Sequence, residues 1–269
     1  MKRWMGTLLA LVAVIAIGPS GWAANEPYVF EEWDMEITVP EGGYYILTQD
    51  MDAESPALAD MGLTAEQVNE ILEQTAICLK IICRDLTYEL NVFAEEGHEA
   101  IFDYALLNEQ QREAMAAESK KIIESSGYTL IGGEVPWYEG EEAVFAIAEL
   151  VPADSKDWSY QYQTVYNGRM VTVGASSLYL EEPTDEIKEQ TRLLAEGIHF
   201  TRKFPVPEEV QKAYEEDENG PSMLMDILKN ALIGAVVGGG GYIVFDLLRK
   251  KKGKKTASES EKLTGEDEL

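Results

Sequence analysis

Residue types that commonly perform chemistry are scarce in this 269-residue sequence. It has two cysteines, Cys78 and Cys83, and two histidines, His98 and His199. The cysteines are five positions apart, so they do not form the CxxC motif of metal or redox sites. On a strand an odd spacing places two side chains on opposite faces, and we expect free thiols. Neither histidine belongs to an HExxH motif, and no GxSxG nucleophile motif is present, so structural histidines are favoured.

Loops that bind nucleotides or calcium are also lacking. The one run of four glycines, Gly238–Gly241, lies inside an apolar segment and does not follow a strand. The acidic clusters do not have the ligand spacing of a calcium loop. A pair of glycosidase carboxylates cannot be singled out among so many acids. We therefore expect no cofactor, no metal site and no catalytic residue.

Basic residues are few, with 22 Lys and Arg against 49 Asp and Glu and a net charge of −27. Residues 24–222 hold 12 of the basic and 42 of the acidic residues, a net charge of −30. This charge repels nucleic acids and anionic membrane surfaces, so binding to either is not expected. It favours cationic partners or divalent ions, although a solvated acidic surface is the more ordinary interpretation.

The N-terminal segment 1–23 is typical of a cleaved signal peptide. Two basic residues precede an uncharged apolar stretch, Met5–Ile17, and helix breakers follow it. Gly21 and Ala23 fit positions −3 and −1 of a cleavage site, which predicts a cut after Ala23. An uncleaved N-terminal anchor is the alternative, but the apolar run is short for a membrane span.

A second apolar segment, 223–248, predicts a transmembrane helix. Its 22 residues Ile227–Leu248 would form about 33 Å of helix, enough for a hydrocarbon core of about 30 Å. Glycines are tolerated there because a backbone in lipid must satisfy its own hydrogen bonds. Small residues form one stripe on this helix, which predicts an interface for a homodimer or for another span. The stripe consists of Ala231, Gly234, Ala235, Gly238 and Gly241.

The orientation follows from the cluster of lysines and arginine at Arg249–Lys255, directly after the predicted span. Positive charge on this side predicts that the tail, 249–269, is cytoplasmic, and a cleaved signal peptide gives the same orientation. We expect a single-pass protein of the cell membrane with an extracytoplasmic domain at residues 24–204. The acidic, proline-containing segment 205–222 is expected to be an extended stalk.

Strand-like and helical patterns alternate along the domain. Met35–Pro40 and Tyr44–Leu47 predict a hairpin turned at Gly42-Gly43. Thr64 with Gln67 predicts the start of a helix. Further strands are expected at Ile77–Cys83, Leu86–Phe93, Tyr128–Gly133 and Ala143–Leu150, and further helices at Ser55–Gly62, Ala100–Ser126 and Thr184–Glu196, before Ile198 and Phe200 close the domain.

The clearest element is a hairpin over Trp158–Ser176, because Asn167-Gly168 predicts a type I′ turn. A two-residue loop fixes the register, with Tyr162 opposite Val173. Aromatic residues alternate along the first strand, so we expect this face to pack on helices in the core.

These patterns predict the α+β class, an antiparallel β-sheet flanked by helices. The order resembles the PsbP-like (αβα, DcrB/PsbP-type) fold, which a photosystem extrinsic protein, a Ran-binding protein and bacterial envelope lipoproteins share. The matching features are the opening MEITVPEGGYYILT, the hairpin YQYQTVYNGRMVTVGASS and the last helix running into GIHF, over roughly Trp33–Phe200. Members of that fold mostly bind or assist other proteins, so the resemblance implies a non-catalytic domain. It carries over no functional residue.

We expect a membrane-anchored binding or accessory domain of the cell envelope with a protein partner that the sequence does not identify. Trp137 and Tyr138, in a predicted loop, are the candidate binding aromatics. One alternative is an extracytoplasmic sensor that acts through a partner in the membrane, because the tail is too short for an output domain. A second alternative is an acidic hydrolase with an unrecognised site.

Overall fold

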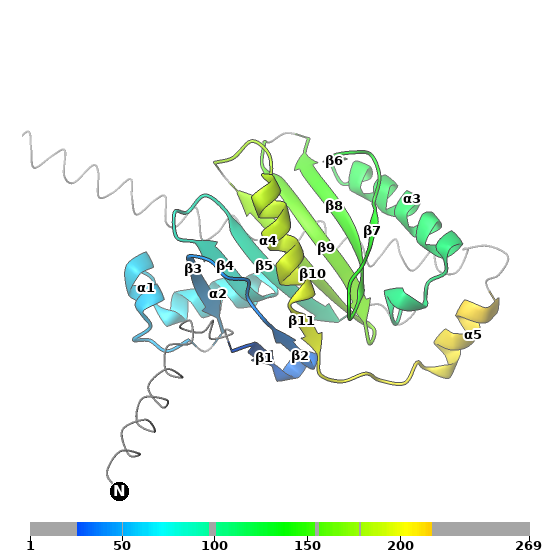
Figure 1. The fold of residues 1–269 in the computed structure, drawn as a ribbon, viewed down its shortest axis with the longest axis horizontal. Helices are drawn as coiled ribbons and strands as arrows, with labels where there is room; N and C mark the ends of the chain where they lie inside the picture. The colour runs from blue at the N-terminus through cyan, green and yellow to red at the C-terminus, as the bar shows by residue number, and fades with distance from the viewer. Residues whose placement is uncertain (1–25, 50, 97–100, 154–155, 178, 217–269) are drawn as a thin grey trace, which may run out of the picture.

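The computed structural model describes residues 26–49, 51–96, 101–153, 156–177 and 179–216 (Figure 1). The predicted signal peptide, transmembrane helix with its small-residue stripe, cytoplasmic tail and His98 lie outside these ranges. Within them, no helix has the length and apolar character needed to cross a membrane. The described chain forms antiparallel sheets flanked by helices, which confirms the predicted α+β class.

The larger sheet has eight strands in the order β3-β4-β5-β10-β9-β8-β6, and β7 pairs with β8. Its inner strands are rich in β-branched and aromatic residues, which suit a sheet that is buried on both faces. The strands are β3 (Tyr44–Thr48), β4 (Ile77–Cys83), β5 (Glu89–Glu96), β6 (Tyr128–Leu130), β7 (Trp137–Glu139), β8 (Val144–Pro152), β9 (Trp158–Tyr166) and β10 (Arg169–Ser177).

A smaller sheet and seven helical segments surround the larger sheet. The smaller sheet has the order β1-β2-β11, from β1 (Tyr28–Phe30), β2 (Met35–Ile37) and β11 (Ile198–Phe200). The helical segments among the described residues are η1 (Glu31–Trp33), α1 (Pro56–Met61), α2 (Ala65–Thr75), η2 (Tyr104–Leu106), α3 (Glu109–Ser125), α4 (Asp185–Glu196) and α5 (Glu208–Glu216).

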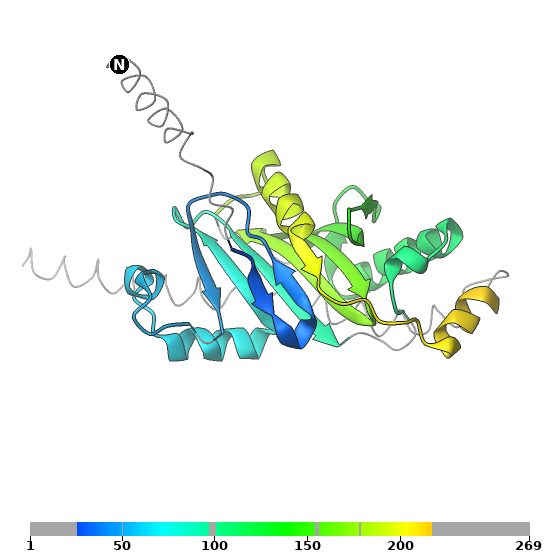
Figure 2. The same ribbon diagram turned by 60° about the horizontal axis from the view of Figure 1, so that its bottom comes forward.

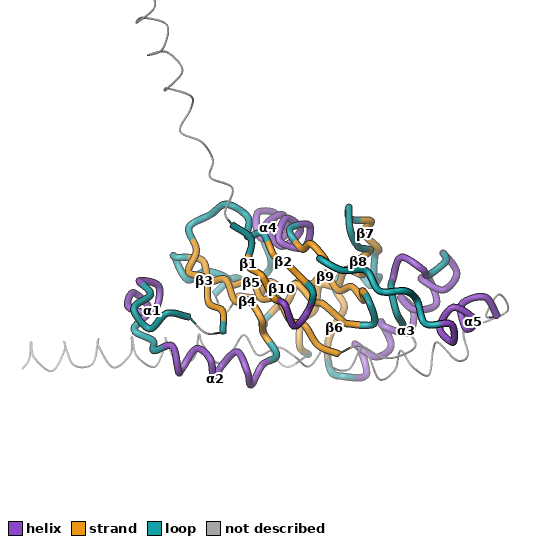
Figure 3. Tube along the Cα trace, turned by 90° about the horizontal axis from the view of Figure 1, so that it is seen from below, coloured by secondary structure: helices purple, strands orange, loops and turns teal. Residues whose placement is uncertain are grey.

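Three apolar clusters hold the layers together. The largest lies between one face of the larger sheet and the layer formed by α4 and the smaller sheet, with Met35, Trp158 and Leu194 among its members. On the opposite face, one cluster lies under α1 and α2 and another under α3. Figure 2 shows α4 and α2 on opposite sides of the sheet, and Figure 3 shows α2 and α3 at its two ends.

The Asn167-Gly168 hairpin is confirmed. Asn167 and Gly168 have φ values of 54° and 74°, as a type I′ turn requires, and Tyr162 pairs with Val173. The turn also contacts other segments. The Gly168 N–H donates to the Phe102 carbonyl at 2.7 Å, and the Asn167 side chain bonds to the backbone of Arg202 and Phe204.

Helix starts follow the capping rules. The predicted capping box of Thr64 and Gln67 is present at α2. A second box, from Asn108 and Gln111, begins α3. The helix predicted over Ala100–Ser126 therefore starts at Glu109, because the Asn108 side chain caps the first turn and the residues before it form η2.

The hairpin predicted from Met35–Pro40 and Tyr44–Leu47 is wrong. β2 pairs with β1 and β11, whereas β3 pairs with β4. The backbone on either side of the Gly42-Gly43 turn is bonded to different partners. The Thr38 N–H donates to the Gly197 carbonyl at 2.8 Å, and the Arg84 N–H donates to the Gly43 carbonyl at 2.9 Å. The two strands consequently belong to different sheets.

The extended stalk predicted over 205–222 is not seen in its described part, where residues 208–216 form α5. Val210 is buried, and the Tyr214 hydroxyl accepts a hydrogen bond from the Phe102 N–H at 3.3 Å. These two residues are four apart on one helix face, so together they anchor α5 to the domain.

The cysteines also differ from expectation. The register of β4 against β5 shifts between Ile77 and Leu79, which makes Cys78 a bulge residue. Cys78 and Cys83 therefore both reach the largest apolar cluster and do not lie on opposite faces. Both are free, as predicted. Burial raises the pKa of Cys78 to about 12 and raises the pKa of the half-buried Cys83.

Candidate functional site

The candidate site is a groove between the outermost strands of the two sheets. β3 ends the larger sheet and β1 ends the smaller one, and no described strand pairs with the outer side of either. Two pockets lie between them and share Tyr28, one of about 450 Å³ and one of about 570 Å³. We call the two together the edge groove.

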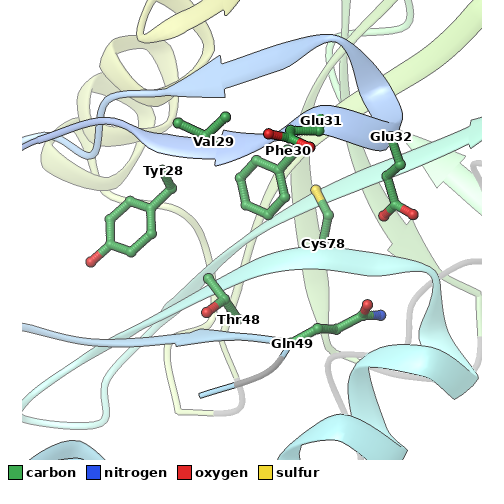
Figure 4. Close-up of a pocket in the computed structure, with 8 residues that line it drawn as sticks. All are labelled: Tyr28, Val29, Phe30, Glu31, Glu32, Thr48, Gln49 and Cys78. Carbon is green, nitrogen blue, oxygen red and sulfur yellow. The ribbon is translucent and has the colours of Figure 1, made fainter. Parts of the chain in front are cut away.

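The first pocket, the cysteine pocket, is lined by Tyr28, Val29, Phe30, Glu31, Glu32, Thr48, Gln49 and Cys78. Figure 4 shows the rings of Tyr28 and Phe30 pointing from β1 toward the strands of the larger sheet, with the Cys78 sulfur facing Phe30. The thiol donates to the Val92 carbonyl at 3.3 Å. The bulge in β4 thus places a small, neutral group at the bottom of the pocket.

The second pocket, the proline pocket, is lined by Glu26, Pro27, Tyr28, Val39, Pro40, Gly42, Tyr44 and Ile46. Its chief polar group, the Tyr44 hydroxyl, donates to Gln190 of α4 at 3.0 Å and lies 3.3 Å from the Tyr88 hydroxyl. A tyrosine hydroxyl is protonated at neutral pH, and burial raises the pKa of Tyr44 further. At Gly42 a Cβ would collide with the Tyr44 ring, so glycine permits this close approach. The Tyr44 side of this wall is therefore fixed in place.

The backbone of β3 is open on its outer side. The hydrogen bond from Arg84 to Gly43 sets the alternation of the antiparallel ladder, so Tyr45 and Leu47 bond toward β4. The N–H and C=O groups of the alternate residues then point away from β4, toward the free edge. These residues are Tyr44, Ile46 and Thr48.

This edge lacks the features that usually protect an edge strand. The β3 sequence YYILT has no charge and no proline, and no bulge interrupts its pairing with β4. Strands of this composition readily accept another strand. At the opposite end of the sheet, β6 is only three residues long and α3 packs against it, whereas β3 is five residues long and contacts α1 and α2.

The groove is acidic. Glu26, Glu31 and Glu32 line it, and among the residues that the structure describes no lysine or arginine belongs to its lining. None of these three carboxylates forms an ion pair with another described residue. By contrast, Asp34 just beyond them is bound by Arg169 at 3.0 Å. The groove therefore presents negative charge that is available to a partner.

The predicted binding aromatics lie elsewhere, on β7 rather than in a loop. Trp137 packs edge-on against Tyr104 at 5.4 Å, with the Arg112 guanidinium over its ring. Tyr138 belongs to the opposite face and bonds to Glu196 of α4. Because successive strand residues point to opposite faces, the pair does not share one surface. That Trp137 and Tyr138 bind a partner stays a prediction.

The remaining polar candidates are engaged in the fold. His199 on β11 contacts Glu142, and Glu139 pairs with Arg112. Within the described ranges, no three His, Cys, Asp or Glu side chains come together as a metal site would need.

A cluster of three polar residues, Lys80, Glu89 and Asn91, is buried inside the larger sheet. Lys80 and Glu89 are fully buried, with Nζ 2.8 Å from Oε1. Asn91 accepts from Lys80 and donates to Glu89, each at 3.0 Å. The second oxygen of Glu89, Oε2, has no hydrogen-bond partner.

Sequence reasoning missed the edge groove. It assigned the segment Tyr44–Leu47 to a hairpin with β2, which would have covered the edge. The available signal was the uncharged run YYILT next to an acidic segment, Glu26–Asp34.

Comparisons with known proteins give little beyond the fold. No protein-family model matches the chain, and no curated protein does. Among solved structures, the chain is similar to the solution structure of cyanobacterial PsbP (CyanoP) from Synechocystis sp. PCC 6803. The identity is 14%, the TM-score is 0.38, and the match covers 68% of this chain and 96% of that chain. The sequence pattern likewise resembles the PsbP-like fold. The function proposed below rests on the groove and not on this similarity.

Proposed function

We propose that the domain is a non-catalytic binding module that holds an extended, cationic polypeptide segment of another protein in the edge groove. The observation that carries the proposal is that an unprotected, uncharged strand edge lies beside three glutamates that form no ion pair with another described residue. An added strand would bond to the outward N–H and C=O groups of β3. The glutamates would attract positive charge and speed the encounter.

The setting of this module is the outer face of a cell membrane. The predicted signal peptide, 1–23, and the predicted span, 223–248, support this placement. The partner would then be a secreted or envelope protein. A protease added to intact cells should remove residues 24–222 and leave a small membrane-bound fragment. Protection of the domain in sealed cells would contradict the proposed location.

Binding is tested with purified full-length protein and a short fluorescent peptide that carries an arginine and, two positions later, a valine. Ile46→Pro removes an N–H that points away from β4, so the fold should persist while the peptide loses a backbone hydrogen bond. We expect binding about fivefold weaker, because one such bond contributes about 1 kcal/mol. Ile46→Val keeps the N–H and is the matched control, and it should bind like the wild type.

Two measurements decide the outcome. Circular dichroism and thermal melting show whether Ile46→Pro is folded, and fluorescence anisotropy measures the affinity at low and high salt. Binding should weaken as salt is raised, because unpaired surface charges are screened. If folded Ile46→Pro binds as tightly as Ile46→Val, the peptide does not pair with β3 and the proposal is wrong.

A further inference from the structure

The two pockets of the edge groove match successive inward side chains of one extended strand. Along β3, Thr48 lines the cysteine pocket and Ile46 lines the proline pocket. These residues are two apart, which is about 6.8 Å in an antiparallel strand. A segment paired with β3 would therefore direct residues i and i+2 into adjacent pockets, with the Tyr28 ring between them.

The cysteine pocket suits a long cationic side chain. Its lower part is apolar, where Phe30 faces the neutral Cys78 thiol, and Glu31 and Glu32 stand at the same pocket. A lysine or arginine can lay its methylene stem on such a surface while its charged end meets carboxylates. A purely apolar side chain would leave these glutamates without a partner.

The proline pocket suits an apolar side chain. Pro27, Val39, Pro40 and Ile46 supply half of its eight lining residues, and its single acid is Glu26. The Tyr44 ring is held by its bonds to Gln190 and Tyr88, so its hydroxyl is already occupied. An aliphatic or aromatic residue would bury apolar surface here, which favours binding.

Strand direction sets the order of the two residues. Every strand pair in the described sheets is antiparallel. β3 runs from the proline pocket toward the cysteine pocket, so an antiparallel segment meets the cysteine pocket first. We infer that the groove selects lysine or arginine followed two positions later by an aliphatic or aromatic residue. This inference rests on the proposed function and adds the partner's sequence pattern to it.

The test compares two peptides of the same composition on the purified full-length protein. One carries arginine, threonine and leucine in that order within a threonine-rich background, and the other reverses arginine and leucine. Fluorescence anisotropy should show the first peptide binding at least about tenfold more tightly, because only it places both side chains in matching pockets.

Matched variants assign the pockets. Glu31→Gln with Glu32→Gln should remove most of the preference for the first peptide, whereas Glu26→Gln in the proline pocket should leave that preference in place. If both peptides bind equally, or the reversed peptide binds better, the inferred pattern is overturned while the binding function stands. An equal loss from Glu26→Gln and from the double variant also overturns it. If neither peptide binds, the proposed function itself fails.

Discussion

Replacing Lys80 with methionine should destabilise the domain severely, because it leaves a buried carboxylate without its cation. Lys80 and Glu89 are both fully buried and lie 2.8 Å apart. After Lys80→Met, Glu89 would keep only the Asn91 amide and the Ser176 hydroxyl as donors. Breaking a buried ion pair from one side typically costs about 3–5 kcal/mol, and we expect a loss of that size.

The double variant Lys80→Met with Glu89→Leu removes both charges together. Replacing a buried ion pair by apolar residues is often neutral or stabilising by about 1–4 kcal/mol. Here Asn91 would lose both of its side-chain partners, which costs about 1–3 kcal/mol. The two effects oppose each other, so the double variant should be close to the wild type and far more stable than either single variant.

Urea unfolding followed by tryptophan fluorescence measures all four proteins of this cycle. The coupling free energy should be several kcal/mol, and the dependence on urea should be similar in each protein. A single variant Lys80→Met within about 1 kcal/mol of the wild type would refute the reasoning, since that value is typical of a solvated pair.

Three further predictions concern other parts of the chain. Gly168→Val should destabilise the domain by roughly 1–2 kcal/mol in thermal or urea unfolding, because φ is +74° there. Gly174→Ala, at an ordinary φ, is the control and should be nearly neutral. Equal effects of the two substitutions would mean that the turn geometry is unimportant. The Cys78 thiol keeps its proton to a pKa of about 12 in the folded state but releases it near 9 when unfolded, so stability should fall as pH rises from 9 to 12. Cys78→Ala should lack this part of the decline, and parallel curves for the two proteins would contradict the burial argument. In a membrane dimerisation reporter, Gly234→Ile with Gly238→Ile should lower the signal, and an unchanged signal would mean that the small-residue stripe is not an interface.

Features governed by neighbouring residues could be predicted from the sequence. The Asn167-Gly168 turn fixed its own register because two residues with positive φ suit the twist of a hairpin. The α2 start followed from Thr64 and Gln67, whose side chains satisfy each other's backbone. Such signals act within four residues and do not depend on the rest of the chain.

Features governed by distant partners could not be predicted. Whether β2 pairs with β3 or with β11 depends on Ile198–Phe200, far along the chain. The local residue pattern of β2 does not indicate which of these strands is its partner. The Cys78 bulge depends on the register between β4 and β5. The edge groove exists because β2 and β3 separate, so missing that separation also hid the site.

The smaller sheet joins the two ends of the domain, and this affects how the chain can fold during synthesis. β2 places Met35 and Ile37 in the core, but one of its neighbours, β11, comes after every strand of the larger sheet. At about 5–20 residues per second, β11 emerges roughly 10–30 seconds after β2. Until then the first strands have an open side, and the domain cannot complete its core. A chain that crosses a membrane N-terminus first would therefore remain unfolded during passage and fold only when its last strand arrives.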